Sequence, residues 1–314
     1  MNFDSSKIHV VIRGAGERTQ KACVDRLNMI FEKNCISLIE EIPFGHALKA
    51  GLQIGIKSEK QWLFCIDADV LITNGGVQKL YDVATIQPPN VFEIQGLIVD
   101  KFFPVRRPSG GRFYRMAYAK EAIDCIPKEG TSLRPEGTML REMARRGYPW
   151  YQSDVVVGVH DFEQYYCDIF RKCFLHAKKH SYLLPKIMPY WLEQSKEDLD
   201  FQVAILAAAY AQAHGGSVSV AKDFGTNEAE KALRELGLEE KDTTVHFKID
   251  QVDEVGNRDF VPGLQELMAP RNILNRITEV PQSKKPSFAK STVARGFEKM
   301  AVILTRMSDS LRKP

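Results

Sequence analysis

The first 75 residues alternate between two kinds of apolar pattern, and this alternation constrains the fold more than any other feature of the sequence. Short apolar runs at IHVVI (8–12), CISLI (35–39) and WLFCI (62–66) predict buried strands. Apolar residues at helical spacing lie between these runs, around residues 20–31 and 45–58. Strands that alternate with helices predict an α/β fold with a mainly parallel sheet flanked by helices.

The pattern changes further along the chain. Residues 91–159 are rich in strand signals and are punctuated by Pro and Gly, which predicts that the sheet is mixed at one edge. After residue 161 the apolar residues follow helical spacing. We therefore expect a catalytic α/β domain over residues 1–180, a mainly helical extension over 181–280, and a basic linker with an amphipathic helix over 281–314.

Two acidic residues follow the third apolar run directly, in Asp67-Ala68-Asp69. In an extended segment, residues two apart face the same way, so we expect both carboxylates to project together from the carboxyl end of a central strand. Ligands bind at that end of open α/β sheets, and carboxylate oxygens beside a diphosphate suit Mg²⁺ or Mn²⁺. The triplet Asp198-Leu199-Asp200 precedes an amphipathic segment instead, so we interpret it as a helix cap.

With these motifs in order, the segment from residue 8 to 180 resembles the GT-A glycosyltransferases, especially those of family 2. The residues that carry the resemblance occur in the family's order along the chain: IRGAGERT (12–19), IEEIPFGHALKAG (39–51), WLFCIDADVLI (62–72), GGRFYRMAYAKEAI (110–123), RPEGTMLREMARRGYPW (134–150) and VVVGVHDFEQ (155–164). The resemblance implies a GT-A, Rossmann-like fold, a nucleotide-diphosphate sugar as donor, and a glycan or lipid-linked acceptor in the synthesis of surface polysaccharide.

The resemblance also implies roles for individual residues. Asp69 and His160 would bind a Mn²⁺ or Mg²⁺ ion directly, and Asp67 would contact the ribose or a water on the metal. Glu136 matches the acidic position that serves the acceptor, although the family has two acidic residues where this chain has one. We expect an inverting transfer in which Glu136 takes the proton from the acceptor hydroxyl and Asp69 assists the reaction through the metal.

The nucleotide is expected over the ends of the first two strands. Glycines allow the backbone to approach a ligand closely, and arginines can hold phosphate with two hydrogen bonds. The candidate residues for binding the nucleotide sugar, besides Asp67, are Arg13, Gly14, Glu17, Arg18, Glu41, Lys49 and Ala68.

Two other classes of function compete with this one. Gly14-Ala15-Gly16 begins a dinucleotide fingerprint, which would suit an oxidoreductase that uses NAD, but Thr19 occupies the place of the third glycine. The second alternative is a non-catalytic protein with a GT-A fold that binds a carbohydrate or a nucleotide.

Charge is concentrated in the last 34 residues, where eight basic residues face two acidic ones, so that the rest of the chain carries about −3. We therefore expect no nucleic-acid partner. Apolar residues at helical spacing from Val293 to Leu311 favour packing on this chain or self-association, with binding to an anionic membrane surface as the alternative. The first residues lack the pattern of a signal peptide, so we expect a cytoplasmic protein, either free or peripheral at the inner face of the membrane.

Overall fold

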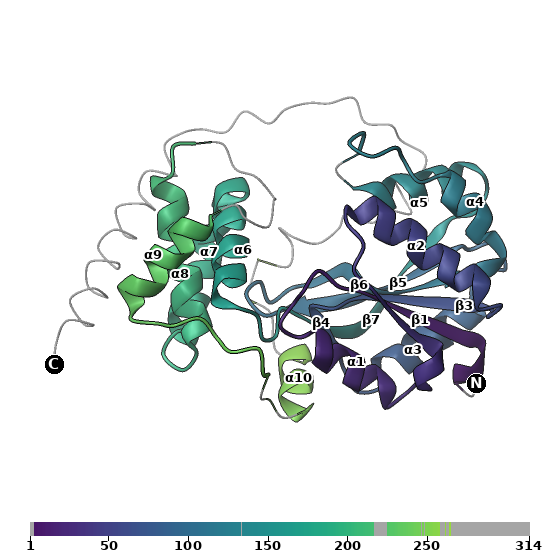
Figure 1. The fold of residues 1–314 in the computed structure, drawn as a ribbon, viewed down its shortest axis with the longest axis horizontal. Helices are drawn as coiled ribbons and strands as arrows, with labels where there is room; N and C mark the ends of the chain where they lie inside the picture. Colours follow the sequence, from purple (N-terminus) through teal and green to yellow (C-terminus); the bar gives the residue numbers. More distant parts are fainter. Residues whose placement is uncertain are drawn as a thin grey trace.

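The structure is a computed structural model and describes residues 3–132, 134–216, 225–245, 247, 249–257, 261 and 264. An α/β sheet with helices on both faces forms one part, and a group of helices beside the sheet forms the other (Figure 1). We call the second part the helical lobe; it comprises α6 (Tyr166–Lys179), α7 (Leu184–Gln194), α8 (Leu199–Ala213) and α9 (Thr226–Leu236).

The sheet has seven strands in the order β2-β1-β3-β6-β5-β7-β4. Their bounds are β1 Ile8–Arg13, β2 Ile36–Ile39, β3 Trp62–Asp67, β4 Val70–Ile72, β5 Glu93–Asp100, β6 Arg106–Arg115 and β7 Trp150–His160. β1 pairs in parallel with β2 and β3, and β5 pairs in parallel with β7, whereas β6 and β4 run antiparallel to their neighbours. This mixed, mostly parallel sheet confirms the predicted fold class.

Helices cover both faces of the sheet, which explains why β1 and β3 are apolar on both sides. Residues alternate between the two faces: Trp62 and Phe64 lie in one core, whereas Leu63 and Cys65 lie in the other. The first core contains α1 (Gln20–Asn28), α3 (Gly76–Ile86) and α10 (Ile249–Gly256), and the second contains α2 (Phe44–Lys57), α4 (Ala119–Asp124) and α5 (Pro135–Arg145) (Figure 1).

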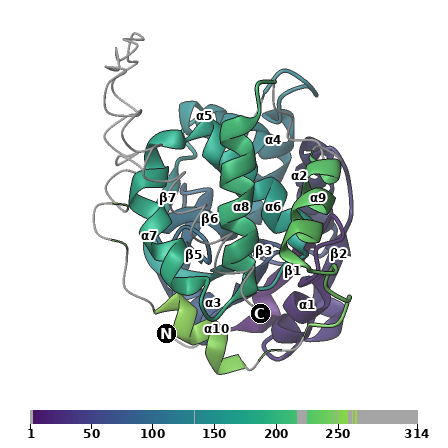
Figure 2. The ribbon, with the colours of Figure 1, turned by 90° about the vertical axis from the view of Figure 1, so that its left-hand side faces the viewer.

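The helices α6 to α9 of the helical lobe pack against one another (Figure 2). Their inner faces form an apolar core of the lobe's own. The segment between β5 and β6 inserts Phe102 and Phe103 into this core, and the indole Nε1 of Trp191 donates a hydrogen bond to the carbonyl of Phe102 over 2.7 Å. At the start of α8, the Asp198 carboxylate accepts from the amide of Asp200 over 2.9 Å, so the predicted capping role of this triplet is confirmed.

The predicted division into domains stays a prediction, although α6 already packs its apolar face into the lobe core before residue 180. The expected linker and helix over residues 281–314 lie outside the described residues. Among the helices that the structure describes, none combines the length and the apolar character that crossing a bilayer requires.

Candidate metal centre and active site

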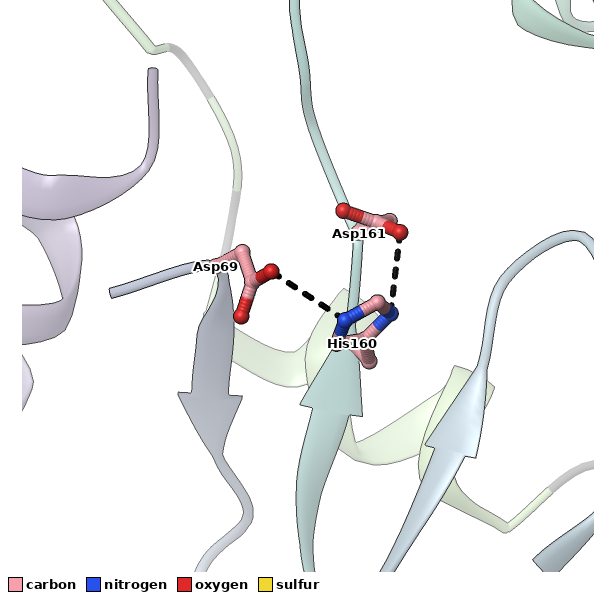
Figure 3. Close-up of side chains that lie close together, drawn as sticks. All are labelled: Asp69, His160 and Asp161. Atoms are coloured by element: carbon pink, nitrogen blue, oxygen red, sulfur yellow. Dashed lines mark ion pairs between the residues drawn. The ribbon is translucent and has the colours of Figure 1, made fainter. Parts of the chain in front are cut away.

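Asp69, His160 and Asp161 meet at one edge of the sheet (Figure 3). His160 ends β7, and the antiparallel pairing of Val70 in β4 with His160 brings the turn before β4 next to it. The amide of Asp161 donates to the carbonyl of Asp69 over 2.9 Å, which fixes the two backbones together. The His160 ring lies between the carboxylates, with Nε2 at 3.1 Å from Asp69 Oδ2 and Nδ1 at 2.9 Å from Asp161 Oδ2.

This cluster has the chemistry of a divalent metal site. One ligand atom from each residue lies within 4.8 Å of the others. Asp69 Oδ1 is buried and has no hydrogen-bond partner among the residues that the structure describes, so an oxygen is left for a cation. Burial lowers the pKa of His160, but the carboxylates of Asp161 and Asp69 outweigh burial and raise this pKa well above its usual value. The cluster therefore favours positive charge at its centre, which a Mn²⁺ or Mg²⁺ ion would supply.

Charged residues surround the cluster from two further elements. Asp100, at the end of β5, places Oδ2 3.0 Å from His160 Nδ1 and accepts from Arg107 Nη2 over 3.1 Å. Lys172 on α6 contacts Asp100 over 2.7 Å and pairs with Asp161 as well. The helical lobe thus contributes a cation directly to the candidate metal centre.

The cluster opens into a cavity of about 390 Å³ between the loop after β1 and helix α6. Gln164 and His176 each contribute a buried polar atom without a hydrogen-bond partner, Oε1 of the first and Nδ1 of the second. The lining residues are Ala15, Gly16, Glu17, Asp69, Arg107, His160, Asp161, Gln164, Asp168, Arg171, Lys172 and His176.

The residues that line this cavity from α6 were not among the site residues predicted from the sequence. Asp168, Arg171, Lys172 and His176 occupy one face of the helix, because they lie three, four and eight positions apart, and the opposite face packs into the lobe core. This polar stripe was visible in the sequence. Its place opposite the sheet was not, since it depends on how the lobe packs.

The predicted nucleotide-binding residues fall into two groups. Glu17 lines the cavity with the neighbouring Ala15 and Gly16, as the predicted loop requires. Arg18 has other partners: it bonds to Glu163 over 2.8 Å and to the carbonyls of Asp242 and Thr244 over 2.7 and 2.8 Å. Arg18 therefore joins the loop to the segment after α9.

The other predicted binding residues lie outside the cavity lining. The Gly14 amide donates to the carbonyl of Ile39 over 2.8 Å, which joins the loop after β1 to the end of β2. Glu41 and Lys49 are exposed, the first just after β2 and the second on α2. Their roles in nucleotide binding stay predictions.

The segment from Asp67 to Asp69 does not have the extended geometry that was expected. Ala68 and Asp69 form a turn between β3 and β4, which corrects that expectation. The turn is held because the Ala68 amide donates to the Arg13 carbonyl over 2.8 Å and the Thr19 hydroxyl donates to the Ala68 carbonyl over 2.9 Å. Asp67 instead pairs with Arg13 Nε over 2.8 Å, so its predicted contact with the metal stays a prediction.

Glu136, the predicted base, belongs to a buried network behind Asp67. Its carboxylate contacts Arg13 Nη1 over 3.0 Å, Arg112 Nη1 over 2.6 Å and the Tyr114 hydroxyl over 2.5 Å. Burial raises the pKa of Glu136, but Arg112 and Arg13 lower it more, so the carboxylate stays ionised. Since three donors already occupy this carboxylate and it does not line the cavity, the geometry favours a positioning role through Arg13; its role as a base stays a prediction.

No family model matches this sequence, and no curated protein matches it. Several solved structures show a limited similarity. A mannosyltransferase from Pyrobaculum calidifontis in complex with GDP-Man and Mn²⁺ is 12% identical, with a TM-score of 0.38 over 78% of this chain and 77% of that one. A glycosyltransferase involved in glycosylation of the major capsid of PBCV-1 is 11% identical, with a TM-score of 0.36 over 50% of this chain and 95% of that one.

An enzyme of another reaction class is similar to the same extent. The 4-diphosphocytidyl-2C-methyl-D-erythritol synthase from Anaerococcus prevotii is 8% identical, with a TM-score of 0.37 over 50% of this chain and 90% of that one. At these scores the interpretation of the site rests on its own geometry.

Proposed function

We propose that this chain is a metal-dependent glycosyltransferase that moves a sugar from a nucleotide-diphosphate sugar to a glycan or lipid-linked acceptor. One observation carries the proposal: the cluster of Asp69, His160 and Asp161 has an unpartnered carboxylate oxygen and opens into a cavity with cationic side chains. Carboxylates and imidazole suit a divalent metal, and nearby cations suit the phosphates of a diphosphate.

The proposed metal ligands are Asp69, His160 and Asp161. When bound, a Mn²⁺ or Mg²⁺ ion would neutralise the negative charge that develops on the departing diphosphate. Arg107, Arg171 and Lys172 line the same cavity, so they can balance further charge on the phosphates. Glu17 accepts a hydrogen bond from the Ala15 amide over 2.6 Å, which orders the loop that faces the diphosphate.

The donor nucleotide is proposed to lie over the ends of β1 and β2, beside Asp67 and Arg13. Arg13 is buried, pairs with Asp67, and stacks on Phe44 at 4.8 Å from the ring centroid, so the position of the Asp67 carboxylate is well defined. A carboxylate that is 31% exposed at this place can accept hydrogen bonds from a ribose. Glu41 and Lys49 are proposed to contact the outer part of the nucleotide.

The acceptor is proposed to enter from the α6 side of the cavity. Gln164 donates from Nε2 to the Thr19 hydroxyl over 3.1 Å, so its unpartnered Oε1 is oriented as an acceptor. Burial lowers the pKa of His176 to about 3, so the imidazole is neutral and its Nδ1 can accept from or donate to a hydroxyl. Such groups suit the hydroxyls of a sugar. We further propose inversion at the transferred carbon, surface polysaccharide as the product, and a cytoplasmic site of action, peripheral to the membrane where the acceptor is lipid-linked.

The decisive experiment combines nucleotide-sugar binding with product analysis. Purified protein is titrated with a panel of nucleotide-diphosphate sugars with and without Mn²⁺ by calorimetry, and the products are separated by chromatography. We expect Mn²⁺-dependent binding and release of the nucleoside diphosphate. Parallel reactions supply nucleoside triphosphates with sugar phosphates, or NAD with a panel of alcohols. Release of pyrophosphate from a triphosphate would identify a nucleotidyltransferase, and hydride transfer to NAD would identify the oxidoreductase. Binding without any turnover on a panel of glycan acceptors would leave the non-catalytic alternative.

A further inference from the structure

The carboxylate of Asp100 faces the candidate metal centre from behind His160. Asp100 ends β5, and the parallel pairing of β5 with β7 places it directly opposite His160. Its side chain is 1% exposed, and its Oδ2 lies 3.0 Å from His160 Nδ1. Sequence analysis gave this residue no role, because nothing in its local sequence marks it.

The two oxygens of Asp100 have separate partners. Oδ1 accepts from the amides of Phe102 and Phe103 over 3.0 and 3.1 Å, which fixes the carboxylate to the backbone. Oδ2 faces the His160 ring and two cations, Arg107 at 3.1 Å and Lys172 at 2.7 Å. Since the rings of Phe102 and Phe103 are anchored in the lobe core, both parts of the molecule hold this carboxylate in place.

We propose that Asp100 is a positioning residue that keeps a proton on His160 Nδ1, so that Nε2 is the ring nitrogen left for a divalent metal ion. This inference rests on the proposed function, because it concerns the same metal centre. A carboxylate can only accept a hydrogen bond, so a ring nitrogen that bonds to it carries the proton. Arg107 Nη2 and Lys172 Nζ also lie 3.3 Å from Nδ1, but both are closer to Asp100 Oδ2, at 3.1 and 2.7 Å. The opposite nitrogen, Nε2, is the one that faces Asp69. A second carboxylate, that of Asp161, also lies against Nδ1 and favours the same tautomer.

Metal-binding histidines commonly depend on such a carboxylate behind the ring, and its loss typically costs about 10–100-fold in metal affinity. Asp100 is suited to this role because no part of it is needed for the metal itself. Its five hydrogen-bond partners are all groups of this chain, whereas Asp69 has an oxygen left over.

The test is Asp100→Asn. Asparagine keeps an oxygen for the amides of Phe102 and Phe103 but turns an NH₂ group toward His160. A donor in that place favours a proton on Nε2 instead of Nδ1, so we expect the Kd for Mn²⁺, measured by calorimetry without nucleotide, to rise about 10–100-fold. The control is Asp154→Asn, which removes the same charge from an exposed residue of β7 that does not line the cavity. We expect the control to change the Kd by less than about threefold, because solvent screens an exposed charge.

A second measurement is made on the wild-type protein, so its result does not depend on how Asp100→Asn folds. In ¹⁵N-histidine-labelled protein saturated with Mg²⁺, the His160 signals, assigned with His160→Ala, should show a protonated Nδ1 and an unprotonated Nε2. A proton on Nε2 in the metal complex would overturn the inference, and so would equal Mn²⁺ affinity of Asp100→Asn and the wild type. Metal binding through Nε2 without any sugar transfer would reject the proposed function and leave this inference intact, whereas a wild type that binds no Mn²⁺ would reject both.

Discussion

Two charged clusters on neighbouring parts of the sheet differ in their access to the cavity beside α6. The first surrounds His160 at the ends of β4 and β7, and the second surrounds Glu136 between β1, β6 and the start of α5. Both combine carboxylates with Lys or Arg at hydrogen-bond distance. They differ in access, because residues of the first line a cavity of about 390 Å³ and those of the second do not.

This difference suggests that the first cluster is the active site and that the second is a structural ion-pair network. In the first cluster Asp69 keeps an unpartnered oxygen, and the pKa of His160 is raised because positive charge is favoured between the carboxylates. In the second cluster the Glu136 carboxylate is occupied by Arg13, Arg112 and Tyr114. We therefore expect substitutions in the first cluster to lower the rate of turnover. Substitutions in the second cluster should lower the stability of the fold and, through Arg13, weaken donor binding.

The largest effect is expected for Asp69→Asn. The amide loses the charge and one of the oxygens that the metal needs, and loss of metal assistance of several kcal/mol corresponds to about a thousandfold or greater fall in kcat. Turnover is measured at saturating Mn²⁺, with thermal unfolding to show that the fold is kept. Asp154→Asn, on an exposed residue of β7, is the matched control and should retain full activity. Near-normal turnover of Asp69→Asn would contradict a catalytic role for the first cluster.

Glu136→Gln tests the second cluster, and here stability should respond first. Neutralising one partner of a buried ion pair leaves Arg13 and Arg112 undercompensated, which costs about 3–5 kcal/mol in the free energy of unfolding. Denaturant titration measures this change. If Glu136 is instead the catalytic base, kcat should fall by about two to four orders of magnitude while stability is largely kept. A loss of stability would assign a structural role to Glu136, and a loss of kcat alone would assign it a catalytic role.

The sequence predicted the sheet, its flanking helices and the carboxyl-end location of Asp69 because these depend on local periodicity. Through the resemblance it also grouped His160 with Asp69, and the two side chains lie 3.1 Å apart, whereas their role as metal ligands stays a prediction. It did not predict Asp100 or Lys172, because their roles come from β5–β7 pairing and from the packing of α6 against the sheet. For the same reason the extended geometry expected for Asp67 and Asp69 was wrong: the turn at Ala68 is set by contacts with Arg13 and Thr19, which are distant in sequence.

The second cluster should also contribute to the pH dependence of stability, through Glu93. Burial raises the pKa of Glu93 from 4.5 to about 7, although its partner Arg112 opposes this rise. The folded state then binds a proton that the unfolded state releases, so the contribution of Glu93 is fully present below about pH 4.5 and is lost as pH rises to about 7. The loss is of the order of 3 kcal/mol. The difference in unfolding free energy between wild type and Glu93→Gln should show this slope, and a difference that is flat from pH 4.5 to 7.5 would contradict it.

The smallest effect is expected for Gln164→Ala, which sharpens the comparison within the cavity itself. Gln164 is 3% exposed, and its Oε1 has no partner in the part of the chain that the structure describes, so removing it costs the fold little beyond the hydrogen bond to Thr19. If this oxygen accepts a hydrogen bond from an acceptor hydroxyl, its loss should raise the acceptor KM by about 5–10-fold, since one such bond contributes about 1 kcal/mol. The donor KM and the Kd for Mn²⁺ should stay unchanged, because neither ligand is proposed to contact Gln164. A rise in the donor KM alone would contradict this placement. It would indicate that the donor binds on the α6 side of the cavity and the acceptor on the opposite side of the metal.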